Sequence, residues 1–342
     1  MIYSPPPVGD NMSLHEQPLA SVLTPVYNGE LYLRECIESV LAQTYSNWEY
    51  TIVNNCSTDG TREIAEEYVR KDSRIRLCNE NVLVGVIANH NRAFRTISAD
   101  SKYCKVVSAD DFIFPDCLSK MVDLAEAHPS IGIVGSYQLS GGSEKWYVRN
   151  HGLPFHKVFV PGREIGRLQL LGRLDVLGAP TSDLYRSDLV RSANEFFPNE
   201  TAEADVSAIY KYLQFTDFGF LHQIVSYERL HDVRVTTASE DRNAYLPSKV
   251  SDLLTYGQFY LTPEEQEKRL KELMDKYYAF LAISAVNFRS KAFWDFHKSR
   301  LRDLGHPLDY VKLGGATCNK LADLLLNPKL TVERVLRRVN TD

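Results

Sequence analysis

Short apolar runs alternate with helix-like stretches along the chain from Leu19 onward. Strands are predicted where apolar and β-branched residues cluster, over Ala20–Thr24, Tyr50–Asn54, Arg74–Cys78, Lys102–Ser108 and Ile131–Ser136. Between these runs apolar residues recur at helical spacing, over Glu30–Gln43, Thr61–Lys71, Val86–Ile97 and Cys117–Ala127. Strands alternating with helices of about ten residues predict an α/β fold, with a mainly parallel sheet and helices on both of its faces.

The boundaries of these elements carry further expectations. We expect the first strand to end at Pro25, because proline has no N–H to donate to a central ladder. We expect Ser57, Thr58 or Asp59 to cap the helix that begins at Thr61. In sheets of this kind ligands bind beyond the carboxyl ends of the strands. The segments that follow the strands are therefore where the chemistry is expected.

The second half of the chain has a different pattern. Residues 137–180 contain many glycine and aromatic residues and give no clear element, whereas Thr201–Leu213 predicts a helix and Phe218–Tyr227 a strand. After about residue 241 amphipathic helices are predicted, over Pro263–Ala285, Phe293–Leu304, Lys320–Leu326 and Val332–Val339. We therefore expect a flexible arm over residues 1–17, an α/β domain over 18–240 and a helical region over 241–342.

Composition narrows the class of protein. The 342 residues are 44% hydrophobic and 24% charged, which is typical of a globular protein with a sizeable core. A net charge of −5 argues against a protein that binds nucleic acid through its phosphates. The six cysteines form no CxxC pair, the first residues lack the features of a signal peptide, and no apolar run reaches the ~20 residues of a membrane span. We expect a cytoplasmic protein, and leave open a peripheral position at the inner face of the membrane.

Two adjacent carboxylates follow the fourth predicted strand, in Ser108-Ala109-Asp110-Asp111. Neighbouring carboxylates repel each other unless a positive group lies near them. A hard divalent cation, Mg²⁺ or Mn²⁺, binds one or two carboxylates and completes its shell with water and phosphate oxygens. The alternative for an isolated Asp-Asp pair is a solvated acidic turn.

Two more strand-to-helix turns are predicted at the same edge of the sheet. The first strand leads into Thr24–Asn28 and the second into Asn54–Thr61. The amide groups at the start of a helix suit anions such as phosphates, although each turn alone is also typical of an ordinary helix cap. Three turns that converge on one edge, one of them with paired carboxylates, favour a site for a nucleotide phosphate and a metal ion.

Four segments together resemble the family 2 glycosyltransferases, an inverting group with the GT-A fold. The segments are PVYN at Pro25–Asn28, NNCSTDGT at Asn54–Thr61, SADD at Ser108–Asp111 and EAD at Glu203–Asp205. Each is short, but their order and spacing are specific, and the resemblance extends over about residues 18–235. It implies a GT-A domain with a helical C-terminal extension that transfers a sugar from a nucleoside diphosphate to an acceptor hydroxyl, with Mn²⁺ or Mg²⁺.

The resemblance also implies roles for individual residues. Contacts with the nucleoside or the donor sugar fall on Thr24, Pro25, Tyr27, Asn54, Asn55, Ser57, His90, Asn91 and Asp110. Metal ligands fall on Asp111, Asp110 and His231. The general base that removes the acceptor proton is Asp205, with Glu203 in reserve.

The chain departs from the family pattern at two of these places. Asn54 and Asn55 stand where many relatives carry an acidic residue that accepts the uracil N3–H; an Asn carbonyl can accept the same bond, so UDP remains favoured. His90 stands where relatives often have arginine, and replaces a fixed cation with a group that titrates near neutrality.

Each assignment has a structural alternative. Asp205 is equally suited to the start of a helix, where the helix dipole favours an acid, and His90 to an exposed helix face. A lone histidine such as His231 is more often structural than a ligand. The loop Gly178–Ser182 carries the weakest expectation, a place near the acceptor.

The expected function is synthesis of a bacterial surface polysaccharide or glycolipid, with a glycan or a lipid-linked glycan as acceptor. One rival is an inactive GT-A protein that only binds a nucleotide sugar or serves as a scaffold. A second rival, an NAD-dependent oxidoreductase, requires G-x-G-x-x-G after the first strand, and this chain has no such spacing there. The aromatic residues of the helical region predict packing, with a homo-oligomer interface or a membrane contact as alternatives. Three terminal arginines suit either anionic lipid or a solvated face, namely Arg334, Arg337 and Arg338.

Overall fold

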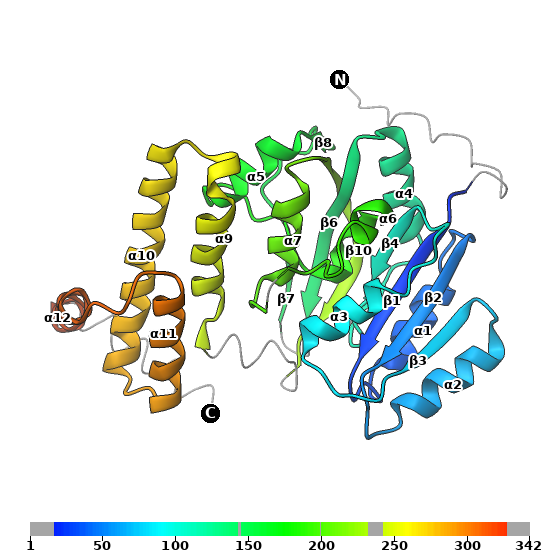
Figure 1. Cartoon of the computed structure of the whole chain (residues 1–342), viewed down its shortest axis with the longest axis horizontal. Coiled ribbons are helices and arrows are strands. Elements are labelled where there is room, and N and C mark those ends of the chain that lie inside the picture. The colour runs from blue at the N-terminus through cyan, green and yellow to red at the C-terminus, as the bar shows by residue number, and fades with distance from the viewer. Residues whose placement is uncertain (1–16, 143–144, 199, 232–241, 327–342) are drawn as a thin grey trace. The chain divides into compact units, whose positions relative to one another are not determined.

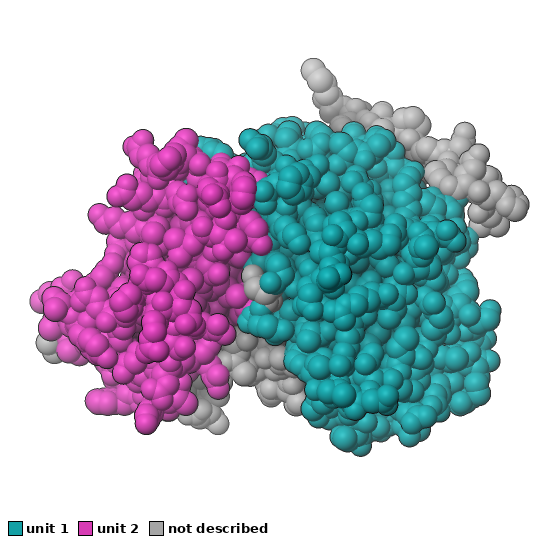
Figure 2. Space-filling model, in the orientation of Figure 1, with its two compact units in different colours: residues 1–200, 204–232 teal, residues 201–203, 233–342 magenta. Residues whose placement is uncertain are grey.

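The computed structural model describes residues 17–142, 145–198, 200–231 and 242–326. The chain divides into two compact units, one of residues 1–200 and 204–232 and the other of residues 201–203 and 233–342 (Figure 2). The expected division into an arm, an α/β domain and a helical region, with boundaries at residues 17 and 240, stays a prediction. Each unit is considered by itself below.

The first unit is built on a ten-stranded sheet (Figure 1). Its strands are β1 Ala20–Val26, β2 Trp48–Asn54, β3 Ile75–Asn79, β4 Tyr103–Val106, β5 Phe112–Ile113, β6 Ile131–Gly141, β7 Trp146–Arg149, β8 Phe159–Val160, β9 Leu184–Arg186 and β10 Asp217–Arg229. The strand order is β3-β2-β1-β4-β9-β6-β10-β5, with β7 beside β6 and β8 beside β10. The first four neighbours are parallel, as are β6 and β10, which confirms the predicted mainly parallel α/β sheet.

Helices follow most strands of this unit. They are α1 Leu33–Leu41, α2 Thr61–Lys71, α3 Val86–Phe94, α4 Cys117–Ala127, α5 Gly162–Leu170, the one-turn η1 Pro180–Ser182, α6 Ser187–Arg191 and α7 Ala204–Tyr212. The predicted bounds of α2 and α4 are confirmed, and α1, α3 and α7 lie within the ranges predicted for them. Asp59 lies before α2, where its Oδ1 accepts the Thr61 N–H at 3.1 Å.

The expectation that the first strand ends at Pro25 is wrong, because β1 continues to Val26. Pro25 pairs with Val53 of β2, whereas the pairing of β1 with β4 stops at Leu23 and Val106. The Val26 carbonyl accepts a hydrogen bond from the residue that follows β2, so the backbone groups of Val26 face β2. Successive residues of a strand direct their backbone groups to opposite neighbours, and the Pro25 nitrogen therefore faces β4. No ladder bond is lost there, and proline is tolerated within a central strand.

Several elements were not predicted from the sequence. They are β5, β7, β8, β9, α5, η1 and α6, together with the helix α9 of the second unit. The three-residue β9 is antiparallel to both β4 and β6, and separates the first parallel group from the β6–β10 pair. Its pairing partners lie about 50 and 80 residues earlier in the chain, so no local periodicity signals it.

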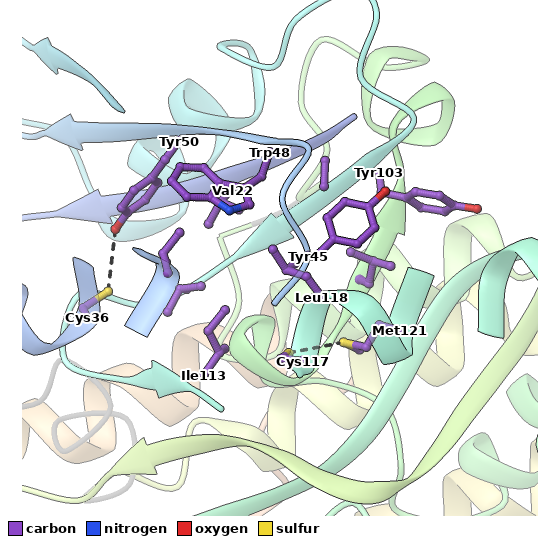
Figure 3. Packing of buried hydrophobic residues seen from close by; sticks show 14 of the residues in the cluster. Val22, Cys36, Tyr45, Trp48, Tyr50, Tyr103, Ile113, Cys117, Leu118 and Met121 are labelled. Atoms are coloured by element: carbon purple, nitrogen blue, oxygen red, sulfur yellow. Dashed lines mark hydrogen bonds between the residues drawn. The ribbon is translucent and has the colours of Figure 1, made fainter. Parts of the chain in front are cut away.

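The core between α1 and the sheet fixes the strands that carry the candidate site (Figure 3). α1 buries Leu33, Cys36, Ile37 and Val40, which lie at helical spacing. Tyr50 of β2 is fully buried, and its hydroxyl lies 3.8 Å from the Cys36 sulfur. Complete burial of each such side chain contributes about 1.5–3 kcal/mol, so this packing holds the carboxyl ends of β1 and β2 in place.

The second unit is helical where it is described. Its helices are α9 Tyr245–Tyr260, α10 Pro263–Val286, α11 Lys291–Asp303 and α12 Tyr310–Leu326. α10 begins at a capping box of Thr262 and Glu265, and the buried Tyr277 hydroxyl lies 2.6 Å from His297 Nδ1 of α11. The helices predicted over 263–285 and 293–304 are confirmed, and the one predicted over 320–326 is the end of a longer α12.

Some expectations for the C-terminal region fall beyond these helices. The predicted helix Val332–Val339, with its three arginines, lies outside the described residues. Within the described residues, none of the helices combines the length and the apolar character that crossing a bilayer requires.

Candidate active site

The turns after β1 and β2 are hydrogen-bonded to each other. The Asn28 amide donates to Ser57 Oγ at 2.9 Å, and the Thr58 amide donates to Asn28 Oδ1 at 2.8 Å. Asn28 and Cys56 both have positive φ angles, 51° and 57°, which turn the chain sharply after each strand. The structure thus brings together the two segments that the sequence predicted to meet at this edge.

The side chains of Asn54 and Asn55 are bonded to the protein itself. Asn54 donates to Asn79 Oδ1 at 2.9 Å and accepts the Ser57 amide at 3.1 Å. Asn55 exchanges two hydrogen bonds with the backbone of Val84, at 2.9 and 3.0 Å. With 4% and 3% of their surface exposed, these amides hold the walls of the crevice. Their expected acceptance of a base N–H stays a prediction.

Three residues of the turn after β1 are predicted to contact the nucleoside, and among them Tyr27 has an exposed side chain. Thr24 is fully buried, and its hydroxyl donates to the Val107 carbonyl at 2.8 Å and lies 2.7 Å from the Tyr50 hydroxyl. Pro25 is buried as well, whereas Tyr27 is 49% exposed. A direct contact of the Thr24 and Pro25 side chains with a nucleoside does not fit this burial, and Tyr27 is the member of the group that is open to a ligand.

Asp110 and Asp111 follow β4 at the same edge of the sheet. Asp111 is 7% exposed; its Oδ2 accepts the Thr181 hydroxyl at 2.7 Å and its Oδ1 accepts the Arg229 amide at 3.1 Å. Burial, and then the adjacent charge of Asp110, raise the pKa of Asp111 well above its ordinary value. The neutral form of Asp111 is therefore favoured unless a positive group lies near the pair.

The segment after β10 closes over Asp110. His231 Nε2 lies 3.1 Å from Asp110 Oδ2, and the His231 ring packs on Tyr32 with 5.0 Å between centroids. Arg229 donates from Nε to the Asp110 carbonyl at 3.2 Å and pairs with Glu35 of α1. The structure thus brings His231 to Asp110 across 121 residues of sequence, and its expected role as a metal ligand stays a prediction.

The donor set fits a divalent cation in part. Among the described residues, no cluster of three or more His, Cys, Asp or Glu side chains is arranged as a preformed metal site. Mg²⁺ and Mn²⁺ often take only one or two carboxylates from the protein and their other ligands from water and phosphates. Asp110, Asp111 and His231 supply oxygens, one imidazole nitrogen and an excess of negative charge, which suits such an ion.

Asp205 lies in the first turn of α7 and is half-buried. Its Oδ2 accepts the Ala179 amide at 2.8 Å. Burial raises the pKa of this carboxyl above its ordinary value, against the lowering effect of three backbone amides and of the charge on Arg149. A carboxylate of raised pKa is a stronger proton acceptor than an exposed one. Glu203, the reserve candidate, belongs to the second unit and pairs there with Lys249 at 3.7 Å.

One short turn touches both acidic groups. Ala179 bonds Asp205, and Thr181, two positions later, bonds Asp111. Two residues of backbone span at most about 7 Å. The structure therefore places the carboxylates after β4 and at the start of α7 on one surface, a few ångströms either side of the same turn.

His90 and Asn91 lie on α3 and face different surroundings. Asn91 is 1% exposed and bonds to Glu195 and to both backbone groups of Phe197 at 2.9 and 3.0 Å, so its side chain holds this part of the chain, and its expected contact with a donor stays a prediction. His90 is half-buried beside Phe197, within electrostatic reach of the two acids at positions 205 and 110. Its Nδ1 lies 2.9 Å from the Val86 carbonyl.

The Val86 carbonyl sets the tautomer of His90. A carbonyl can only accept a hydrogen bond, so Nδ1 of His90 carries the proton and, in the neutral ring, Nε2 keeps its lone pair. Burial lowers the pKa of His90, which favours this neutral form. A neutral imidazole of this tautomer accepts a hydrogen bond from a hydroxyl, unlike the arginine that the resemblance led one to expect at this position.

Sequence reasoning missed several residues of the site. Arg229 and Glu228 belong to the segment that was singled out for its histidine, but no role was assigned to them. Arg149, on the unpredicted β7, donates to both oxygens of Glu228 at 3.1 and 2.9 Å. The loop before β9 was given only a weak place near the acceptor, although it contacts two of the acids.

Comparison with known proteins identifies a family and a fold. The family model described as glycosyl transferase family 2 matches residues 21–191, half of the chain. Over 107 residues the chain is 36% identical to TuaG of Bacillus subtilis, a glycosyltransferase whose name refers to teichuronic acid biosynthesis, and over 191 residues it is 28% identical to the glycosyltransferase EpsJ of the same organism. These matches span 31% and 56% of this chain, and only 42% and 54% of the two relatives.

Solved structures share the fold at low sequence identity. S. aureus TarS 1-349 in complex with UDP-GlcNAc superposes with a TM-score of 0.60 at 18% identity, over 94% of this chain and 92% of that one. The mannosyltransferase PcManGT of Pyrobaculum calidifontis, in complex with GDP-Man and Mn²⁺, gives a TM-score of 0.54 at 15% identity, over 91% and 89% of the two chains.

Proposed function

Because this chain belongs to the glycosyl transferase family 2, we propose that it transfers a sugar from a nucleoside diphosphate, with UDP favoured, to an acceptor hydroxyl with inversion at the anomeric carbon. Asp205 is the general base and the Asp110–Asp111 turn is the site of the diphosphate. The observation that supports this proposal most is that a single turn contacts two acids. Asp111 lies near the ends of β1 and β2, and Asp205 lies at the start of α7.

Asp205 suits the role of base because it is half-buried and because its carboxylate is held in place. The Ala179 amide donates to Oδ2 and other backbone amides at the start of α7 orient the group, which would take the proton from an acceptor hydroxyl. The raised pKa makes this carboxylate a stronger proton acceptor than an exposed aspartate. A base on one side of the anomeric carbon and a diphosphate site on the other is the arrangement that a single inverting displacement needs.

The acid pair would hold a divalent cation. Asp110, Asp111 and His231 are its candidate ligands, and Mn²⁺ or Mg²⁺ bound there neutralises negative charge on the departing diphosphate. Arg229 contributes to the same end through its own charge, since its guanidinium lies beside the Asp110 carbonyl and is aligned by Glu35. TarS binds UDP-GlcNAc and PcManGT binds GDP-Man with Mn²⁺, which supports a nucleotide-sugar donor without fixing its base.

The donor lies along the crevice edge in this proposal. Tyr27 is exposed and available for the nucleoside, and Asn54 and Asn55 shape the pocket wall through their bonds to the backbone. His90, with Nε2 as an acceptor, receives a hydroxyl of the donor sugar. The acceptor is a glycan or a lipid-linked glycan of a bacterial surface polymer, which the relation to TuaG supports, and the site of action is the cytoplasm, with contact at the membrane surface where the acceptor is lipid-linked.

A panel of sugar nucleotides tests the proposal. Each of UDP-, GDP- and dTDP-sugars is added with and without Mn²⁺, and both the shift in Tm and the slow hydrolysis of the donor are measured. A donor at 100 times its Kd stabilises the protein by about 2.7 kcal/mol, so binding at this level is measurable as a shift in Tm. We expect one UDP-sugar to stabilise most, and to be hydrolysed only when the metal is present.

Two variants separate catalysis from binding alone. Asp205→Asn should bind the same donor as the wild type and hydrolyse it far more slowly. Asp111→Asn should lose the effect of Mn²⁺ on binding. Turnover that survives in both variants would refute the roles assigned to these two residues, and donor binding without turnover in the wild type would favour the inactive alternative. The absence of stabilisation by any nucleotide sugar would refute the proposed function.

A further inference from the structure

The turn that joins the two acids is the segment Gly178–Asp183, here called the bridging turn. It makes one hydrogen bond to each acid: from the Ala179 amide to Asp205 at 2.8 Å, and from the Thr181 hydroxyl to Asp111 at 2.7 Å. The two donors are separated by a single residue of the chain. A displacement of the bridging turn therefore moves both carboxylates, and changes the gap in which the proposed reaction takes place.

A buried lysine ties the bridging turn to the sheet. Lys105 lies in the middle of β4, has no exposed surface, and donates from Nζ to the carbonyls of Thr181 at 2.7 Å and Asp183 at 3.0 Å. The sulfur of Met121 lies 3.8 Å from the same nitrogen. β4 is also the strand that leads into Asp111, so one cation connects the turn to the strand that carries the first acid.

This arrangement is unfavourable for stability alone. A charge buried this deeply is costly, and replacement of buried charges by apolar residues of similar volume is often neutral or stabilising. Asp183, the nearest acid to Lys105, is itself fully buried, and its Oδ1 has no hydrogen-bond partner among the described residues. The protein therefore keeps two buried ionisable groups beneath the bridging turn, where two apolar residues of similar volume would often be as stable.

The backbone of the bridging turn is also strained. Ala179 has φ 64° and ψ 99°, a conformation that residues with a Cβ rarely adopt, and it follows Gly178 at φ 105°. Such a conformation persists only where its surroundings hold it in place, and it is concentrated at functional sites. Ala179 is the residue whose amide reaches Asp205, so the strained peptide is the one that orients the proposed base.

We propose that Lys105 is a positioning residue that acts through the bridging turn, and that it sets the separation of Asp111 and Asp205 for the transfer reaction. The inference rests on the proposed function for its consequence in catalysis. The structural part of the proposal is that removal of Lys105 shifts both hydrogen bonds of the turn, and this part does not depend on the proposed function.

The test compares two Lys→Met variants from the same segment of the chain. Lys105→Met removes the buried cation and its donors but keeps an unbranched side chain of similar length beside Met121. Lys102→Met is the matched control, because Lys102 is half-exposed and pairs only at the surface with Glu126, at 2.6 Å. For Lys105→Met, which leaves the carbonyls of Thr181 and Asp183 without this donor, we expect a lower Tm in a protein that still folds, a donor KM within about threefold of the wild type and a kcat lower by 10- to 100-fold, on the order of the loss that a 1 Å misplacement produces. Lys102→Met should leave all three near the wild type.

A double-mutant cycle then separates positioning from general damage. Thr181→Val removes the hydroxyl that bonds Asp111 and should lower kcat by a similar factor. If Lys105 acts through the turn, the combined variant Lys105→Met/Thr181→Val loses little more than the worse single variant. Losses that multiply would mean that the two residues act independently, and would overturn the proposal.

Other outcomes are decisive as well. A folded Lys105→Met with the kcat of Lys102→Met overturns the proposal. If Lys105→Met does not fold, Lys105→Gln serves in its place, since it is neutral and too short to reach both carbonyls; failure of both to fold would make Lys105 a stabilising residue and would also overturn it. A crystal structure of the variant that keeps the bonds of Ala179 and Thr181 to the two acids does the same. That structure is informative even if the wild type turns over no sugar nucleotide, a result that would refute the proposed function alone.

Discussion

Replacement of Asp205 by asparagine should change activity and stability in opposite directions. Asparagine keeps the shape of the side chain, and its Oδ1 can still accept the Ala179 amide, so the start of α7 should be preserved. It cannot take a proton from an acceptor hydroxyl. General-base catalysis contributes about 10²–10⁴-fold to rate. At 1.36 kcal/mol per factor of ten, the variant should lose about 3–5 kcal/mol of transition-state stabilisation, seen as a lower kcat with a donor KM close to that of the wild type.

The effect on stability follows from the sign of the pKa shift. Burial raises the folded-state pKa of Asp205 above the value of about 3.9 in the unfolded chain. The folded state thus binds the proton more tightly than the unfolded chain does. This difference adds to the free energy of unfolding in full below about pH 4, and the added stability is lost as the pH rises through the folded-state pKa. At pH 7 the charged carboxylate lowers the free energy of unfolding. The asparagine variant carries no charge, so it should be as stable as the wild type or more stable at pH 7, and this difference should vanish towards pH 4.

Urea unfolding at pH 7 and pH 4, with steady-state rates on the donor found in the screen, measures both effects on one preparation. The structural alternative, a helix N-terminal acid stabilised by the dipole, predicts the reverse: a loss of about 0.3–1 kcal/mol in unfolding free energy and an unchanged kcat. A variant that is less stable and fully active would refute the reasoning. The same argument predicts that the acid limb of the wild-type kcat profile lies above the ordinary pKa of an aspartate.

Three further predictions concern the metal, the donor and the core. Asp111→Asn should abolish the Mn²⁺-dependent part of UDP binding in calorimetry while the metal-independent part remains; an unchanged metal effect would remove Asp111 from the ligand set. His90→Gln keeps a side-chain acceptor and should retain more kcat than His90→Leu, which should lose about tenfold, the value of one hydrogen bond to the donor; the opposite order would contradict the assigned tautomer. Leu33→Ala in α1, where the side chain is fully buried, should lower the unfolding free energy by about 2–5 kcal/mol, whereas Leu31→Ala, at a side chain that is 79% exposed, should change it by less than about 0.5 kcal/mol.

The sequence by itself determined the elements whose periodicity is local. α2 and α4 have the bounds that their apolar spacing predicts, and the first three strands lie where β-branched runs occur. The same regularity places the segments after β1, β2 and β4 at one edge, because parallel strands joined by helices end on the same side. The acids that follow β4 could therefore be assigned to a site before any coordinates were considered.

Tertiary structure alone decided which of the expected residues are open to a ligand. Thr24, Asn54, Asn55 and Asn91 belong to segments of the right kind, yet each is buried and bonded to the protein by partners up to 106 residues away. A motif specifies residue type and order, but exposure depends on how distant segments pack, and no local pattern encodes that.

The link between the two acids was equally beyond the sequence. β9 and the turn before it are short and irregular, and they take their positions from hydrogen bonds to β4, β6 and the side chain of Lys105. From the sequence alone, a lysine within an apolar strand is an exception to the apolar pattern with no apparent role. Only the folded chain reveals that its three-donor head lies beneath the turn that contacts Asp111 and Asp205, because the contacts that define it join residues 70 to 78 positions apart.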